Sequence, residues 1–125
     1  MKSIAALPFL ALLAACVGTP LPEPIPDGQP VGLGETVHVG GLIAAPRRVT
    51  EDSRCPLDVQ CIQAGRVVVT TRLDGQGWSE TVPLTLDEAY LTHGTTVTLV
   101  SVRPDKYSDR NTPRAEYRFI FDGGD

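Results

Sequence analysis

The chain has 125 residues, with 11 basic and 15 acidic side chains, a formal net charge of −4 and 42% hydrophobic residues. This length allows one domain with a modest hydrophobic core. The small excess of acid argues against nucleic-acid binding, which requires a basic face, and is compatible with a basic protein partner or metal cations.

Residues 1–15 have the anatomy of a secretory signal peptide. Lys2 provides a positive start, residues 4–13 form an apolar run too short for a normal membrane-spanning helix, and two alanines follow. Because Cys16 comes next, the segment resembles the bacterial lipoprotein signal, in which this cysteine becomes the lipidated first residue of the mature chain. The resemblance implies anchoring in the cell envelope, at the periplasmic face of the outer membrane in a Gram-negative organism, since Val17 rather than aspartate follows the cysteine. The alternatives are an ordinary cleaved signal peptide, or a short core helix followed by a chance cysteine.

Residues 16–34 are expected to form a tether after Cys16. Five of the eleven prolines lie between Thr19 and Pro30, where they remove amide donors and restrict φ, so this stretch can form neither a helix nor the interior of a sheet. Such a segment extends by roughly 3 Å per residue and holds a folded domain away from a lipid surface. Recognition by a proline-binding domain is the alternative.

Residues 35–125 show the pattern of β structure, with short β-branched or alternating runs separated by glycine-rich turns. The expected strands cover 36–39, 42–44, 47–50, 66–73, 78–84, 95–102 and 115–121. The sequence therefore predicts an all-β domain, a small antiparallel β-sandwich or partly open barrel of six or seven short strands.

Three details of this pattern are specific enough to check. Pro83 predicts that strand 78–84 lies at a sheet edge or ends there, because proline cannot donate to a strand ladder. Residues 85–91 could form one helical turn, with Thr85 as its cap. In the last strand, alternate residues are expected on one buried face, namely Ala115, Tyr117, Phe119 and Phe121.

Cys55 and Cys61 form an even pair if Cys16 carries the lipid, and exported proteins meet an oxidising compartment. This favours a disulfide, which for such a small loop adds roughly 2–2.5 kcal/mol in the chain-entropy description. A metal site that includes His38 or His93 is the alternative, with free thiols as a third. Structural zinc usually shows closer cysteine spacing and four ligands at recognisable intervals, so we expect no metal and no other cofactor.

Residues 51–65, with the sequence EDSRCPLDVQCIQAG, are the least generic part of the domain. They resemble a motif of small, mostly uncharacterised bacterial exported proteins and lipoproteins. That motif has Asp-Ser-Arg-Cys-Pro, a second cysteine six positions on, and then an apolar residue, Trp, Ala and Gly. Gln63 stands where the motif has tryptophan. The resemblance implies an exported β domain and brings no established reaction with it.

The candidate site residues of this loop are Asp52, Ser53, Arg54, Pro56 and Asp58. Asp52 and Ser53 can accept hydrogen bonds from following amides, and Arg54 can bind loop carbonyls or carboxylates. Pro56 stiffens the turn, and Asp58 tolerates a left-handed conformation. The loop is thus either a rigid structural element at one end of the sandwich or a recognition surface there.

Two further features bear on these alternatives. Gly65 is expected to allow close backbone approach where the chain enters the next strand. Residues 103–114, which carry both charge signs and a tyrosine, are either a solvated hairpin loop or a second partner-binding loop.

The sequence contains no recognisable catalytic motif. Ser53 and Asp52 with His38 or His93 are the only triad that can be drawn, and no Gly-x-Ser-x-Gly context supports it. We therefore expect a non-enzymatic, lipid-anchored envelope lipoprotein whose β domain binds a partner or provides structural support. Its expected contacts are the membrane, through the lipid, and an envelope protein. The alternative is an inhibitor of a basic cell-wall-degrading enzyme such as lysozyme.

Overall fold

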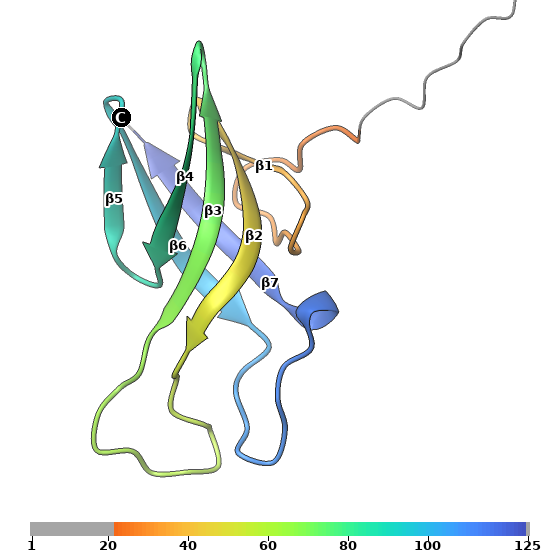
Figure 1. The fold of residues 1–125 in the computed structure, drawn as a ribbon, viewed down its shortest axis with the longest axis vertical. Helices are drawn as coiled ribbons and strands as arrows, with labels where there is room; N and C mark the ends of the chain where they lie inside the picture. Colours follow the sequence, from red (N-terminus) through yellow and green to blue (C-terminus); the bar gives the residue numbers. More distant parts are fainter. Residues whose placement is uncertain (1–21, 125) are drawn as a thin grey trace, which may run out of the picture.

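The computed structural model describes residues 22–124, so the predicted signal peptide and Cys16 lie outside the described residues. Two antiparallel sheets pack face to face as a β-sandwich (Figure 1). The first sheet has the order β1 (Val37–Val39), β2 (Leu42–Asp52), β3 (Val67–Gly75) and β4 (Trp78–Thr85). The second has the order β5 (Ala89–Thr92), β6 (Thr95–Arg103) and β7 (Arg118–Gly124). The predicted all-β class is confirmed.

The four-stranded sheet follows the sequence pattern closely. The β-branched strand β3 lies inside the sheet, and β4, which contains Pro83, lies at its edge as predicted. Two expected short strands are joined into the single strand β2, which continues through Pro46. This proline is tolerated because β1 pairs only with Leu42–Ala44 and the register shifts directly after Pro46.

The folded part begins before residue 35, where the sequence placed its start. Ile25 forms a parallel bridge with Val37 of β1, and Val31 forms an antiparallel bridge with Phe119 of β7. Val31 is completely buried, so the segment before β1 belongs to the domain and contacts both sheets. The prolines exclude a regular strand in this segment, and Ile25 and Val31 each form one isolated bridge instead.

Two local predictions are wrong. Residues 85–91 do not form a helical turn, because Leu86 bridges to Leu99, Asp87 has a positive φ of 67° and β5 begins at Ala89. Ala115 is exposed in a short 3₁₀ helix, Arg114–Glu116, so β7 begins only at Arg118.

The core lies between the two sheets and consists mostly of aliphatic side chains. The predicted alternation at the end of the chain is confirmed for three aromatic residues, since Tyr117, Phe119 and Phe121 are all buried. Among the described residues, no helix is long and apolar enough to cross a membrane.

Two long connections extend together from one end of the sandwich, the lower end in Figure 1. They are residues 53–66, between β2 and β3, and residues 104–117, between β6 and β7. We refer to them as the loop pair. The first contains most of the motif segment 51–65, so the fold places the least generic part of the sequence at this end.

Candidate functional site

A disulfide closes the tip of the first loop. Cys55 and Cys61 are bonded, with their Cα atoms 5.9 Å apart. The prediction of a disulfide is confirmed, and it excludes the alternative in which these two sulfurs bind a metal. Among residues 22–124, no group of three or more His, Cys, Asp or Glu side chains is placed to hold a metal ion.

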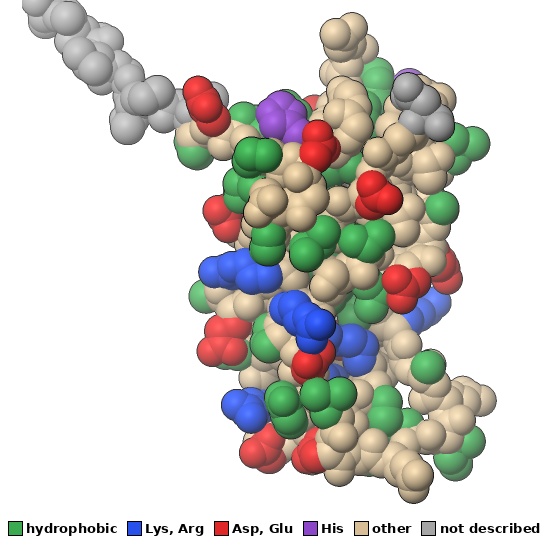
Figure 2. All heavy atoms as spheres, turned by 180° about the vertical axis from the view of Figure 1, so that it is seen from behind, with side chains coloured by type: hydrophobic (Ala, Val, Ile, Leu, Met, Phe, Trp, Pro, Cys, Tyr) green, Lys and Arg blue, Asp and Glu red, His purple; other side chains and the backbone are tan. Residues whose placement is uncertain are grey.

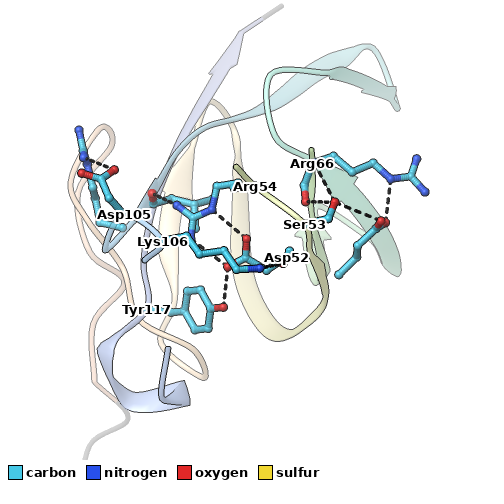
Figure 3. A network of polar contacts seen from close by, with 10 residues as sticks. Asp52, Ser53, Arg54, Arg66, Asp105, Lys106 and Tyr117 are labelled. Carbon is cyan, nitrogen blue, oxygen red and sulfur yellow. Dashed lines mark hydrogen bonds and ion pairs between the residues drawn. The ribbon is translucent and has the colours of Figure 1, made fainter. Parts of the chain in front are cut away.

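Asp52 and Arg54 form the centre of a polar network at the base of the loop pair (Figure 3). Arg54 Nε and Nη2 donate to Asp52 Oδ1 and Oδ2, each at 2.9 Å, and Nη1 donates to the carbonyl of Val102 at 3.0 Å. The Tyr117 hydroxyl donates to Asp52 Oδ2 at 2.8 Å. The network therefore joins the end of β2 to β6 and to Tyr117, which directly precedes β7.

The ionisation of this network follows from its contacts. Burial acts to raise the pKa of Asp52, but hydrogen bonds from Arg54 and Tyr117 outweigh it and hold the pKa below the ordinary 3.8. The hydrogen bond to Asp52 raises the pKa of Arg54. Burial, together with the hydrogen bond to Asp52, raises the pKa of Tyr117 to about 12. The pair Asp52–Arg54 is therefore charged and mutually satisfied.

The neck of the first loop is closed by Ser53 and Arg66. Ser53 N donates to the Arg66 carbonyl at 2.8 Å, and Arg66 N donates to the side-chain oxygen Ser53 Oγ at 3.0 Å. Ser53 thus accepts from an amide, as expected, although the donor lies across the loop. Gly65 fits tightly here, because a Cβ atom on it would lie 1.5 Å from the Ser53 carbonyl oxygen.

The two loops are also bound to each other beyond the neck. Leu57 N donates to the Lys106 carbonyl at 2.9 Å, and Lys106 Nζ donates to the Asp52 carbonyl. Ser108 donates to the Asp58 carboxylate twice, from its backbone N at 3.0 Å and from its hydroxyl, which lowers the pKa of Asp58. Residues 103–114 are therefore not a free hairpin at this point but part of one structure with the first loop.

Pro56 has the local role that the sequence suggests, whereas Asp58 has a different one. Pro56 begins a turn in which its carbonyl accepts from Val59 N at 3.1 Å, as its stiffness suggests. Asp58 tolerates a left-handed conformation but does not adopt one, since among the described residues only Asp87 and His93 have a positive φ apart from glycines. Asp58 instead serves as the acceptor for Ser108.

The sequence contained no signal for several members of the network. The Val102 carbonyl contacts Arg54, and Lys106 contacts Asp52, each from about fifty positions away along the chain. Tyr117 could be placed on the buried side by alternation, but not beside Asp52. Such partners depend on how the two sheets are stacked, which local patterns do not report.

The histidines lie away from this end, so the drawn triad with Ser53 and Asp52 is not assembled. His38 is exposed on β1, and His93 lies in the turn between β5 and β6 with φ 48°. The imidazole of His93 stacks on Trp78, with ring centroids 3.7 Å apart. His93 therefore packs against the other sheet rather than against Ser53.

Comparison of the chain with protein-family models, with curated proteins and with solved structures finds no match. A functional assignment of the domain therefore depends on the geometry of the loop pair.

Proposed function

We propose that this protein is a lipid-anchored lipoprotein of the cell envelope whose β domain binds a partner, without catalysis, through the loop pair. The proposed location in the cell envelope is supported by the signal-like residues 1–15 and by Cys16. The binding role is supported by one structural observation: the two longest connections are fastened to each other and to both sheets. Loops held by a rigid scaffold are common recognition sites.

Several separate interactions hold the loop pair in place. Asp52, Arg54 and Tyr117 hold the base, Ser53 and Arg66 close the neck, and a disulfide closes the tip. A surface ordered before binding loses less conformational entropy when a partner docks. Arg54 itself serves structure, since its side chain is only 15% exposed and its donors are directed at Asp52 and Val102. Recognition is therefore assigned to the residues beyond it.

An inhibitor of a basic wall-degrading enzyme is the second candidate, because a pinned, protruding loop suits insertion into an enzyme cleft. The charge of the loop pair gives the inhibitor candidate less support. Residues 51–66 and 103–118 together carry seven basic and six acidic side chains, so the acid excess of the chain lies elsewhere. In Figure 2, the basic side chains visible on the rear face lie mostly around the middle of the molecule, with acidic side chains above and below them. A lysozyme activity assay with the purified domain tests this candidate directly, and unchanged activity at saturating domain concentration contradicts it.

The anchoring half of the proposal is tested by fractionation. The full chain and Cys16→Ser are expressed in a Gram-negative host, with the double variant Cys55→Ser/Cys61→Ser as the matched control. We expect the wild-type chain and the control to be acylated and recovered with the membranes, because stable anchoring needs more than one acyl chain and only Cys16 would receive them. Cys16→Ser should be soluble. Unchanged membrane retention of Cys16→Ser contradicts the anchor.

A further inference from the structure

The exposed apolar side chains of the described residues are concentrated on the loop pair. Four of the six large hydrophobic residues that are exposed lie there: Leu57 (63% exposed), Val59 (46%), Ile62 (103%) and Tyr107 (36%). We call these four the apex patch. The other two, Leu91 and Val100, lie on the three-stranded sheet. Scattered exposed apolar residues are normal, whereas a group of them marks an interaction site.

The apex patch is held in place by the disulfide and by bonds between the two loops. Leu57 and Val59 lie inside the disulfide ring, and Ile62 follows it directly. The backbone bond from Leu57 to Lys106 fixes the first loop against the second, where the Arg110 guanidinium lies 4.7 Å from the centroid of the Tyr107 ring. The patch is thus a projecting, pre-ordered surface.

The surroundings of the patch resemble the rim of a protein–protein interface. Three exposed amide side chains, Gln60, Gln63 and Asn111, lie on the same two loops. They offer hydrogen-bond donors and acceptors without charge. An apolar centre with a polar, hydrated rim is the usual composition of a protein interface.

The mature N-terminal segment cannot cover the patch. The mature chain before Pro22 consists of six residues, 16–21, and six residues extend by at most about 22 Å. Pro22 lines a groove together with Ile43, near the start of β2. From Ile43 to Asp52 the strand alone covers roughly 30 Å, and the apex patch lies beyond its end.

A second copy of the chain and a lipid surface fit less well. Two projecting tips of four side chains each would bury far less than the roughly 800 Å² per partner of a stable complex. Anionic lipids attract clusters of Lys and Arg, whereas the tip carries Asp58 and Asp109 against Arg110. A concave protein surface, by contrast, can enclose a projecting patch and bury it fully.

We propose that the apex patch inserts into an apolar cleft of a folded envelope protein, with Leu57 and Ile62 as its central contacts. This inference rests on the proposed function and specifies the chemistry of the partner's site: concave, apolar and without strong net charge. Because the patch itself contains no charged residue, binding should change little with salt.

The test uses the full, anchored chain in cells. A photo-crosslinking amino acid is placed at position 62, or at position 91 as the matched control, since Leu91 is also largely exposed but lies on β5. We expect one discrete adduct from position 62 and none from position 91.

The protein in the adduct is identified by mass spectrometry, purified, and titrated with the wild-type chain, Ile62→Asp and Leu91→Asp. Ile62→Asp should weaken binding by at least about tenfold, as loss of a central contact does, and Leu91→Asp should not. Both variants should melt as the wild type does, because both side chains are exposed.

Four other results overturn the proposal. An adduct from position 91 alone places the partner on β5, so it overturns the apex patch and the loop pair as the binding site and leaves only the non-catalytic binding role standing. Adducts from neither position contradict both the apex patch and the binding role. If the unacylated Cys16→Ser chain sediments with phosphatidylethanolamine–phosphatidylglycerol vesicles, and the added Ile62→Asp substitution abolishes this, the patch is a membrane contact. If the chain forms concentration-dependent dimers in analytical ultracentrifugation, and Ile62→Asp abolishes them, the patch is a contact between two copies of the chain.

Discussion

Asp52 and Arg54 meet side by side, with two parallel hydrogen bonds of 2.9 Å between guanidinium and carboxylate, although only one residue separates them in the chain. The remaining terminal nitrogen of Arg54 reaches the carbonyl of Val102 in the other sheet. One side chain thus satisfies the end of β2 and clamps it to β6. A planar fork of donors is needed for this, and lysine offers only a point charge.

Arg54→Ala should lower the free energy of unfolding by about 2–3 kcal/mol. The substitution leaves the Asp52 carboxylate and the Val102 carbonyl without their donor in a partly buried position, and hydrogen bonds to charged groups are the stronger class. Urea denaturation followed by circular dichroism measures the change. The matched control is Arg66→Ala, whose ion pair with Glu51 is exposed and should contribute at most about 1 kcal/mol. Equal, small effects of both substitutions would show that Arg54 is not a structural clamp.

Asp52 should make stability depend on pH in the acid range. Its pKa in the folded state lies below the ordinary 3.8, so folding favours the carboxylate. This contribution is complete well above pH 3.8 and is lost as the pH falls through the folded-state pKa. Asp52→Asn should therefore be less stable than the wild type near neutral pH, and the difference should shrink between about pH 5 and pH 2. Asp109→Asn, at an exposed carboxylate, serves as the control. A difference that stays constant with pH would exclude Asp52 as the titrating group.

The sequence predicted what depends on short-range order. Alternation along the last strand placed Phe119 and Phe121 in the core, and an even pair of cysteines in an exported chain favoured the disulfide. Loop carbonyls or carboxylates were the expected partners of Arg54, and the carboxylate that it binds is that of Asp52. Tyr117 and Lys106 could not be assigned to the same network, since only the stacking of the sheets brings them there.

The errors have a similar origin. In residues 85–91 a capping pattern suggested a helical turn, but pairing of Leu86 with Leu99 across the sandwich overrides that weak local preference. The prolines before β1 suggested a tether, yet Val31 lies directly after them and is buried completely. Local preferences excluded regular structure in that segment and said nothing about single buried residues.

Gly65→Ala should be strongly destabilising, by at least about 2 kcal/mol, because the new Cβ would overlap the backbone of Ser53 rather than a movable side chain. Thermal and urea denaturation measure it. Gly41→Ala is the matched control: Gly41 also lies on a strand connection, a Cβ on it would meet nothing within 4 Å, and its change should stay within about 0.5 kcal/mol. A Gly65→Ala protein as stable as the wild type would contradict the tight neck of the loop.

Reduction of the Cys55–Cys61 bond should lower the melting temperature. The bond contributes roughly 2 kcal/mol in the chain-entropy description, and each kcal/mol corresponds to roughly 4–8 °C in a domain of this size. Scanning calorimetry with and without reductant checks this. The double variant Cys55→Ser/Cys61→Ser should melt at the lower temperature under both conditions. Alkylatable thiols in the unreduced, purified wild-type protein would contradict the assignment.

His93→Ala should loosen the end of the sandwich opposite the loop pair. His93 covers one face of the Trp78 indole at 3.7 Å, which connects the β5–β6 turn to the first residue of β4 in the other sheet. Loss of such a stacked pair costs about 0.5–1.5 kcal/mol. Trp78 is the single tryptophan of the chain, so tryptophan emission reports the surroundings of this ring and should shift to longer wavelength as water reaches it. His38→Ala removes the other histidine, which is exposed on β1, and should change neither emission nor stability. Identical spectra for His93→Ala and the wild type would mean that the stack does not persist in solution.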